Sequence, residues 1–341
     1  MQHAERQHAR LSASRAERFM TCPGSVRLEA LMPYEPPGEA AALGTALHEL
    51  SERILRGEQI DDPDIPPDHI EMAQSYANYV NSVSENPRKK LIEVNLDKGL
   101  KSLHPSLGGT ADAVVVEGNH LHIIDAKFGR VLVEAENNKQ LMTYALGAMR
   151  QLNAPADIQC TMHIFQPRAG HSKWTVSGVD LISHGHDLVN SARLALSPDA
   201  PTIPSPDACK YCKAKTICPS MRQKVQDNAR KDFAPDTTVT PEMIELAKLA
   251  ETWSEAVLTA AKQQLTNGAT INGWNLKPGR KTRFWKSEEL AAAALKDYPQ
   301  AFTLRSPAAI ADLKIEVSEE LIGITHAAPS LAKEKAKKAQ D

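Results

Sequence analysis

Apolar and polar residues follow the pattern of a β-hairpin in the middle of the chain. Two strand-like runs, 110–117 and 120–128, are separated by Gly118-Asn119. A two-residue loop that contains glycine favours a tight hairpin turn between such runs. With this turn, position 112 pairs with position 125. Further strands are predicted at 91–97, 158–166 and 173–179.

Helical periodicity flanks these strands. Between 39 and 57, leucine or isoleucine recurs at spacings of three and four residues, which places these side chains on one helical face. A short helix is expected within 11–30, ending at Cys22-Pro23-Gly24. Other helices are predicted at 68–84, 137–152, 180–196 and 241–266. The pattern predicts an α/β fold in which helices flank a mixed central sheet.

Two changes of composition suggest the domain organisation. Residues 197–208 contain four prolines and predict a rigid connector. The composition changes again near residue 235. We expect one domain over 1–234, with an N-terminal helical segment and a C-terminal cysteine cluster. The remainder, 235–341, is expected to be mainly helical, with a basic and aromatic hairpin at 277–286 and short helices at 287–299 and 307–322.

The overall charge and hydropathy exclude some classes of protein. The 341-residue chain has a formal net charge of −2, so it is not a uniformly basic nucleic-acid coat. The first residues lack the apolar core of a secretory signal, and no run approaches the roughly 20 apolar residues of a membrane span. We therefore expect a cytoplasmic protein that does not enter the membrane, with cysteines that act as ligands or bystanders rather than disulfides.

The predicted hairpin carries a candidate metal site. Asp112 and Asp125 would face each other, and side chains of such cross-strand partners lie about 4.5–5.5 Å apart at Cβ. Lys127, two residues beyond Asp125, would point to the same face. Two acids and a lysine that converge in this way suggest a bound cation with a positioned ammonium group. The alternative is a solvated polar face without a ligand.

Other polar residues lie close to this hairpin in the predicted fold. His48 sits at the edge of the apolar face of the 39–57 helix, where a lone histidine is most often structural. Gln140 and Tyr144 are four residues apart on one helix and therefore share a face. Glu93, on the predicted 91–97 strand, could face the hairpin acids or point to water.

The cysteines suggest a second metal centre. Cys209, Cys212 and Cys218 have the spacing C-x2-C-x5-C, which indicates thiolate ligands of a metal. A fourth ligand must come from elsewhere. Cys22 is the best candidate, because Cys160 is expected inside a strand. On chemical grounds, these four thiolates would suit a zinc ion and an iron–sulfur cluster equally well.

The order of these motifs resembles a known family. His48, Gly109-x-x-Asp112, Asp125-x-Lys127 and Gln140-x-x-x-Tyr144 are similar to the motifs of the RecB-like branch of the PD-(D/E)XK nucleases. An early cysteine with a late C-x2-C-x5-C resembles its iron–sulfur subset, which includes AddB-type nuclease domains and CRISPR-associated RecB-like exonucleases. The chain looks most like the stand-alone, phage-borne members. The resemblance covers about residues 11–222.

The resemblance implies a PD-(D/E)XK restriction-endonuclease-like core, with 1–234 as the nuclease domain. It implies that Mg²⁺ or Mn²⁺ is held by His48, Asp112, Asp125 and the backbone carbonyl of Ala126. Lys127 would orient the attacking water and offset negative charge, and Gln140 and Tyr144 would position DNA or Lys127. The implied cofactor of the cysteines is a structural 4Fe–4S cluster, or zinc as the alternative, and its ligands would be Cys22, Cys209, Cys212 and Cys218.

The implied function is a metal-dependent deoxyribonuclease, most simply an exonuclease acting on single-stranded or end-containing DNA in phage recombination or DNA processing. A phage recombination protein or a single-strand-binding protein is an expected partner. The alternative is a non-catalytic DNA-binding or scaffold protein that retains the fold and the cysteine clasp. Trp274, Phe284 and Trp285 flank or lie within the basic 277–286 segment, which could stack on single-stranded DNA or simply pack on the 241–266 helix.

Overall fold

The structure is a computed structural model that describes residues 9–34, 36–229, 239–276 and 296. The chain divides into a first unit, Met1–Leu276, and a second unit, Lys277–Asp341. All described helices and strands belong to the first unit. The predicted hairpin at 277–286 and the predicted helices at 287–299 and 307–322 lie outside the described residues, apart from residue 296.

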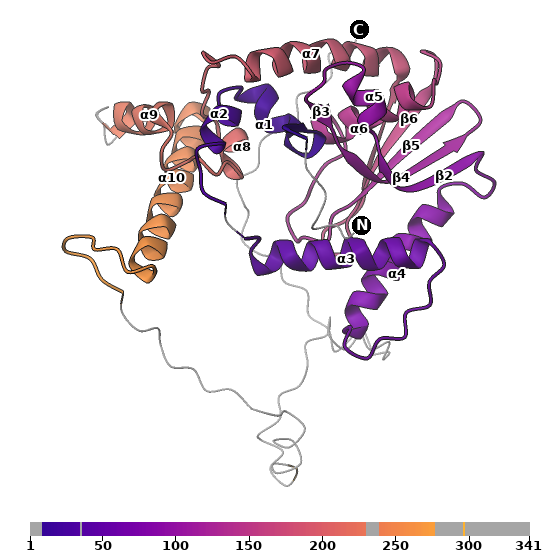
Figure 1. The fold of residues 1–341 in the computed structure, drawn as a ribbon, viewed down its shortest axis with the longest axis horizontal. Coiled ribbons are helices and arrows are strands. Elements are labelled where there is room, and N and C mark those ends of the chain that lie inside the picture. Colours follow the sequence, from indigo (N-terminus) through magenta and orange to yellow (C-terminus); the bar gives the residue numbers. More distant parts are fainter. Residues whose placement is uncertain (1–8, 35, 230–238, 277–295, 297–341) are drawn as a thin grey trace. The chain divides into compact units, whose positions relative to one another are not determined.

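A five-stranded mixed sheet forms the centre of the first unit, in the order β2-β4-β5-β6-β7 (Figure 1). The β5–β6 pair is parallel, and the other neighbouring pairs are antiparallel. The mixed sheet and its flanking helices confirm the predicted α/β class. The strands are β2 (Lys89–Asn95), β4 (Thr110–Glu117), β5 (His120–Ala126), β6 (Gln159–Phe165) and β7 (Ser172–Ser177).

The β4–β5 hairpin has the predicted register. Glu117 pairs with His120 across the turn, and Ala113 pairs with Ile124 near the other end. Gly118 has a backbone φ of 55°, in the left-handed region that glycine adopts without the steric cost of a Cβ atom. The short turn therefore fixes which side chains of the two strands face each other.

Helices cover both faces of the sheet. Alternate residues of β4 point to opposite sides, so Val114 and Val116 enter one hydrophobic core, whereas Ala113 and Val115 enter the other. The first core also contains apolar residues of α1 (Ala16–Thr21), α6 (Lys139–Gln151) and α7 (Gly178–Ala195). The second core is closed by α3 (Glu39–Leu55) and α4 (Pro67–Ser82).

Most elements were predictable from periodicity. The predicted strands and the five longer predicted helices are all present, with ends that differ by two residues at most. The last of them, α10, spans Pro241–Thr266 as predicted. Several short elements were not predicted. They are the parallel pair β1 (Leu11–Ser12) and β3 (Leu107–Gly108), and the helices α2 (Ser25–Glu29), α5 (Asp97–Lys101), α8 (Pro206–Lys210) and α9 (Pro219–Ala229).

The C-terminal part of the first unit is helical. Leu249 of α10 packs with Cys209 and Met221, so α10 contacts the region of the late cysteines. The predicted boundary near residue 235 stays a prediction. Among the described helices, none combines the length and hydropathy of a membrane span.

The short helix α5 supports α6, which carries two of the predicted site residues. The two helices approach so closely at Gly99 that an added Cβ atom would lie 2.1 Å from the carbonyl oxygen of Gly147. The backbone N–H of Gly99 also donates to the side chain of Gln151 at 3.3 Å. The position of α6 therefore depends on a glycine at residue 99.

We predict that Gly99→Ala lowers the free energy of unfolding by about 1–3 kcal/mol, because the methyl group would force α5 away from α6. Gly44→Ala is the matched control, since Gly44 lies in a helix with open space at its Cβ position. The control should be neutral or stabilising by up to about 1 kcal/mol. Urea unfolding of the full chain measures both, and equal stability of the two variants would contradict the close contact.

Candidate functional site

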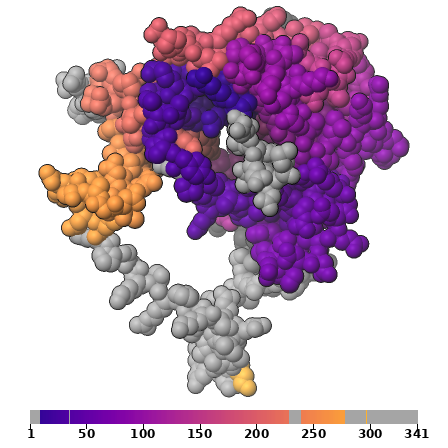
Figure 2. All heavy atoms as spheres, in the orientation of Figure 1, coloured from indigo at the N-terminus to yellow at the C-terminus, as the bar shows by residue number. Residues whose placement is uncertain are grey.

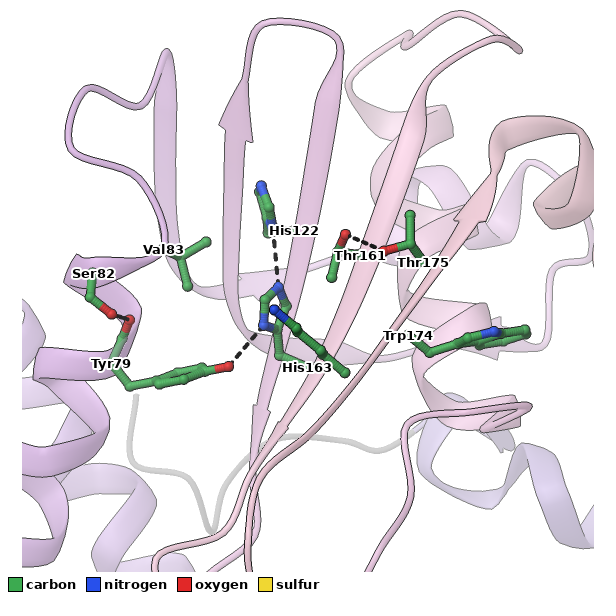
Figure 3. Close-up of a pocket in the computed structure, with 9 residues that line it drawn as sticks. Tyr79, Ser82, Val83, His122, Thr161, His163, Trp174 and Thr175 are labelled. Carbon is green, nitrogen blue, oxygen red and sulfur yellow. Dashed lines mark hydrogen bonds between the residues drawn. The ribbon is translucent and has the colours of Figure 1, made fainter. Parts of the chain in front are cut away.

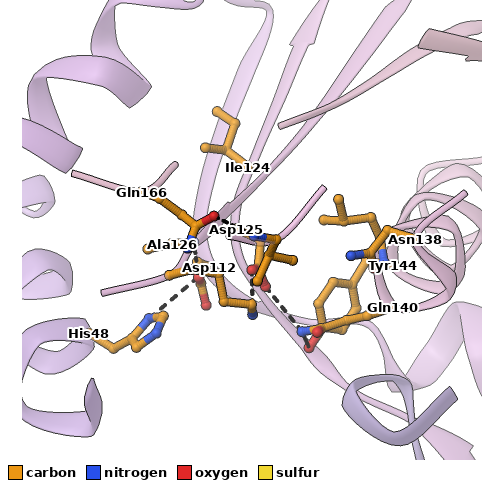
Figure 4. Close-up of polar contacts among 12 residues, drawn as sticks. His48, Asp112, Ile124, Asp125, Ala126, Asn138, Gln140, Tyr144 and Gln166 are labelled. Atoms are coloured by element: carbon orange, nitrogen blue, oxygen red, sulfur yellow. Dashed lines mark hydrogen bonds and ion pairs between the residues drawn. The ribbon is translucent and has the colours of Figure 1, made fainter. Parts of the chain in front are cut away.

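Asp112 and Asp125 meet at the end of the hairpin that is remote from its turn (Figure 4). One step beyond the last ladder pair, Oδ2 of Asp112 accepts a hydrogen bond of 2.8 Å from the backbone N–H of Ala126. Asp125 is only 3% exposed. A solvated polar face therefore does not describe Asp125, because its carboxyl group is buried inside the protein.

Lys127 supplies a positive charge beside Asp125. Its Nζ lies 2.5 Å from Oδ2 of Asp125, and its backbone N–H donates to the carbonyl of Phe165 at 2.8 Å. Burial alone favours the neutral amine, but the carboxylates of Asp125 and Asp112 more than offset this effect and raise the pKa of Lys127. Lys127 is therefore a cation at neutral pH.

Helix α6 contributes Gln140 and Tyr144 to the same cluster. Nε2 of Gln140 donates to Oδ1 of Asp125 at 3.1 Å and to the Tyr144 hydroxyl at 3.2 Å (Figure 4). Asn138 caps the start of this helix by accepting a hydrogen bond from the Leu141 N–H at 3.1 Å, which favours a helix start one turn before Tyr144. The cap and the spacing together aim both side chains at Asp125.

The second oxygen of Asp125, Oδ2, is buried and has Lys127 as its partner. The ammonium nitrogen lies 2.5 Å away, and among the described residues no second group interacts with Oδ2 by a hydrogen bond. A carboxylate oxygen has two lone pairs and can accept a second partner. A cation would therefore share Oδ2 with Lys127.

His48 and Glu93 complete the cluster from two other elements. Nδ1 of His48, on α3, lies 3.4 Å from Oδ2 of Asp112, and its ring meets the edge of Phe128 with centroids 5.3 Å apart. Ligand atoms of His48, Glu93 and Asp112 all lie within 4.8 Å of one another. The sequence left the direction of the Glu93 side chain open, and the structure places it beside His48 and Asp112.

The backbone at Glu93 is unusual for a residue inside a strand. Its φ is 50°, in the left-handed region that residues other than glycine seldom adopt. Neighbouring residues of β2 pair with β4 on either side of Asp112, so Glu93 lies opposite that acid. Such strain costs of order 1–3 kcal/mol and is found most often at functional sites.

The surroundings of Asp112 disfavour its charged form. Burial raises the pKa of Asp112 to about 6, and the nearby carboxylates of Asp125 and Glu93 act in the same direction, against His48 and Lys127. Without a bound cation, the cluster thus gathers more negative charge than its own cations balance. Oxygen donors with one imidazole suit a hard divalent ion, particularly Mn²⁺ or Mg²⁺. The carbonyl of Ala126 stays a predicted ligand.

The predicted cysteine centre joins two distant parts of the sequence. Cys22 follows α1, Cys209 lies in α8, and Cys218 directly precedes α9. Cys209 interacts electrostatically with both Cys22 and Cys218, and Cys212 with Cys209. In Figure 2 the indigo N-terminal segment lies beside the salmon-coloured segment that contains the late cysteines. Cys160 is buried in β6, as expected.

Polar contacts hold these two segments against each other. Arg18 forms an ion pair with Glu29 and donates to the carbonyl of Tyr211 at 2.7 Å. The Lys213 N–H donates to Glu29 at 2.8 Å, and the Ile203 N–H donates to Sγ of Cys22 at 3.2 Å. The last contact suits a thiolate that carries negative charge, as a metal ligand does.

Burial raises the pKa of the metal-free thiols. It does so for Cys22 and Cys209, and it raises the pKa of Cys212 to about 12. Neighbouring thiols add to the shift of Cys22 and Cys209. Deprotonation of this cluster at neutral pH therefore requires a compensating positive charge, which a metal centre would provide.

Sequence comparison places the chain in a family. The family model DUF2800, described as a protein of unknown function, matches residues 8–338. The chain belongs to the DUF2800 family. Among solved structures, this DUF2800 member is similar to the crystal structure of SSO0001, with 14% identity and a TM-score of 0.33 over 63% of this chain and 88% of that chain. A likeness this distant carries no argument about activity.

The raised pKa of Asp112 predicts a pH-dependent cost to stability. Between about pH 4 and pH 6 the folded protein keeps a proton on Asp112 that an unfolded carboxyl has lost, so stability falls as the pH rises through this window. Above pH 6 the charged Asp112 lowers the free energy of unfolding by at most about 3 kcal/mol. Asp112→Asn keeps an oxygen acceptor for the Ala126 N–H and removes the charge.

Without divalent ions, Asp112→Asn should be more stable than the natural protein near pH 7.5, and the difference should close near pH 4. Denaturant unfolding at several pH values measures this. Asp157→Asn, at an exposed position, is the control and should not change the pH profile. A lower stability of Asp112→Asn at every pH would contradict the unfavourable charge at Asp112.

Proposed function

We propose that the chain is a Mg²⁺- or Mn²⁺-dependent deoxyribonuclease of the RecB-like PD-(D/E)XK type. The observation that carries the proposal is the convergence of Lys127, Gln140 and Tyr144 around Asp125. Lys127 and Gln140 contact its two oxygens, and Tyr144 contacts Gln140. These are the residues, in the order, that the resemblance assigns to catalysis.

The residues present fit a divalent ion. Asp112 and Asp125 would be the carboxylate ligands, with His48 and the carbonyl of Ala126 as further ligands, and Glu93 lies close enough to His48 and Asp112 to join them. Oδ2 of Asp125 is buried and pairs with Lys127, and the cation would share this oxygen with the ammonium group. A bound Mg²⁺ or Mn²⁺ would supply Lewis acidity at the phosphate and lower the pKa of its water.

Lys127 has a separate part in the proposed reaction. Its ammonium group remains charged because two carboxylates stabilise it. Held beside Asp125, it would orient the attacking water by hydrogen bonding and offset the negative charge that develops on the phosphate. Gln140 would keep Asp125 in one orientation and link it to Tyr144, so that neither carboxylate oxygen rotates away from the reacting groups.

The four cysteines would hold a 4Fe–4S cluster with a structural part. Cys22 comes from the N-terminal segment and Cys209, Cys212 and Cys218 from the late segment, so a shared cluster would tie the two together. Helix α1, which ends beside Cys22, also packs against α6 and α7. Loss of the cluster would therefore loosen the support of α6.

The proposed substrate is single-stranded or end-containing DNA, cleaved exonucleolytically during phage recombination or DNA processing. A recombination protein or single-strand-binding protein of a phage is the proposed partner. This assignment follows the family resemblance, and the assay below separates it from a non-catalytic DNA-binding protein.

We predict that Lys127→Ala lowers the cleavage rate by about 100- to 1000-fold or more, because charge stabilisation at the phosphate is lost. The assay uses anaerobically purified protein, Mg²⁺ or Mn²⁺, and labelled linear and circular DNA in single- and double-stranded form. Cleavage that spares circles would identify an exonuclease. Binding of the same DNA, measured by fluorescence anisotropy, should change little.

Lys89→Ala is the matched control, since Lys89 is exposed on β2 of the same sheet, and it should cleave at the natural rate. Cleavage by Lys127→Ala at the natural rate would contradict the assigned role. If the natural protein, with its metal centre assembled, binds DNA but cleaves none of these substrates, the non-catalytic DNA-binding function is the correct one.

We predict that Cys22→Ser removes the iron and the brown colour and lowers the melting temperature. Iron should fall from about four atoms per chain to near zero, because an incomplete thiolate set does not retain the cluster. Cys160→Ala is the control, since Cys160 is buried in the sheet, and it should keep its iron. Metal analysis and visible absorbance measure both. A colourless natural protein with one zinc ion would refute the iron–sulfur assignment alone.

A further inference from the structure

Three histidines lie together on the sheet at a place that the proposed nuclease site does not use. His120 and His122 are on β5 and His163 is on the neighbouring β6. His122 is two residues before Ile124, whose side chain belongs to the core under α3 and α4, so it faces that side of the sheet. Asp125 points to the other side. The histidines therefore form a site separate from the acids.

An open pocket of about 540 Å³ gives solvent access to this site (Figure 3). His122 and His163 line it together with Tyr79 at the end of α4 and Trp174 of β7. His163 is 6% exposed and His122 is partly exposed, so the pair sits at the base of the pocket rather than on the outer surface.

Hydrogen bonds fix the orientation of the two rings that face each other. Nδ1 of His122 and Nε2 of His163 are 3.1 Å apart, and Nδ1 of His163 is 3.0 Å from the Tyr79 hydroxyl (Figure 3). The ring of His120 stacks on that of His122 with centroids 4.4 Å apart. The rings are therefore aligned before any ligand arrives.

The two facing nitrogens have nearly the separation that a metal ion requires. Imidazole nitrogens lie about 2.0–2.1 Å from Zn²⁺, which places two tetrahedral ligands about 3.3–3.4 Å apart. His122 and His163 need to separate by only a few tenths of an ångström from 3.1 Å. Tyr79 would then accept the Nδ1–H of His163, the kind of outer contact that orients a ligating histidine.

Both histidines are neutral at physiological pH, the form that binds metals. Burial lowers the pKa of His122 to about 4 and that of His163 to about 3. His120 lowers the pKa of both histidines further, and His122 also lowers that of His163. Lys173 adds an unfavourable positive charge near His163, and Glu117 a favourable negative charge near His122. Protons therefore compete weakly for these nitrogens.

We propose that His122 Nδ1 and His163 Nε2 bind one borderline divalent transition ion, such as Zn²⁺, Ni²⁺ or Cu²⁺, with water from the pocket as the remaining ligands. Imidazole suits these ions, whereas Mg²⁺ prefers oxygen ligands. The bound ion would join β5 to β6 through side chains and, through Tyr79, to α4. It would stabilise the sheet independently of the carboxylate cluster.

Equilibrium dialysis of the untagged full chain against Ni²⁺, followed by metal analysis, tests the proposal. The natural protein should hold one more Ni²⁺ per chain than either His122→Asn or His163→Gln. His186→Asn is the matched control, because His186 is exposed on α7, and it should keep the natural count. An unchanged count in His122→Asn and His163→Gln would overturn the proposal.

The pH dependence gives a second criterion. Histidines with the ordinary pKa of about 6.5 are mostly protonated at about pH 5.5 and lose Ni²⁺ there. The ion at His122 and His163 should remain bound at that pH, because both pKa values are lower. Loss of the additional ion between about pH 7.5 and 5.5 would assign it to ordinary surface histidines instead.

Ring ¹⁵N signals of the natural protein provide a test that needs no variant to fold. Zn²⁺ should shift the signals of two histidines, His122 and His163. His184 serves as an internal control, since it is buried on α7 and its Nε2 forms a hydrogen bond of 3.1 Å with the Thr143 hydroxyl. Shifts confined to exposed histidines would overturn the proposal.

Discussion

Two carboxyl groups lie opposite each other on a hairpin whose other side chains are largely buried, and their repulsion has to be balanced. The protein balances it only in part. Lys127 pairs with Asp125, and the Ala126 N–H donates to Asp112. The pKa of Asp112 is nevertheless raised to about 6, by burial first and then by the carboxylates of Asp125 and Glu93. This residual imbalance is the physical reason to infer a cation site.

The surrounding elements can be understood as supports for that pair. Helix α6 directs Gln140 to Asp125, and α5 fixes α6 by a contact that admits no side chain at Gly99. Helix α3 brings His48 to Asp112, and β2 brings Glu93 at the cost of a left-handed backbone. The four proposed cysteine ligands lie where α1 meets the segment that contains Cys209, Cys212 and Cys218. A cluster bound there would stabilise this arrangement.

Local sequence was sufficient for the hairpin and its acids, because a two-residue turn at Gly118 dictates the register of the strands it joins. The helical spacing of Gln140 and Tyr144 was likewise visible. Glu93 was left undecided, because the register of β2 against β4 depends on long-range pairing that no turn records. The contact between His122 and His163 was not predicted for the same reason, because the parallel strands β5 and β6 are joined through α6 and not by a turn.

If Asp112 and Asp125 hold a divalent ion, anomalous diffraction from crystals soaked in Mn²⁺ will locate it. Mn²⁺ favours oxygen-rich sites over sites made of imidazole alone. One strong manganese peak is expected in contact with both carboxylates, with His48 or Glu93 beside it. Manganese bound only elsewhere, or no peak beside well-ordered Asp112 and Asp125 side chains, would rule this site out.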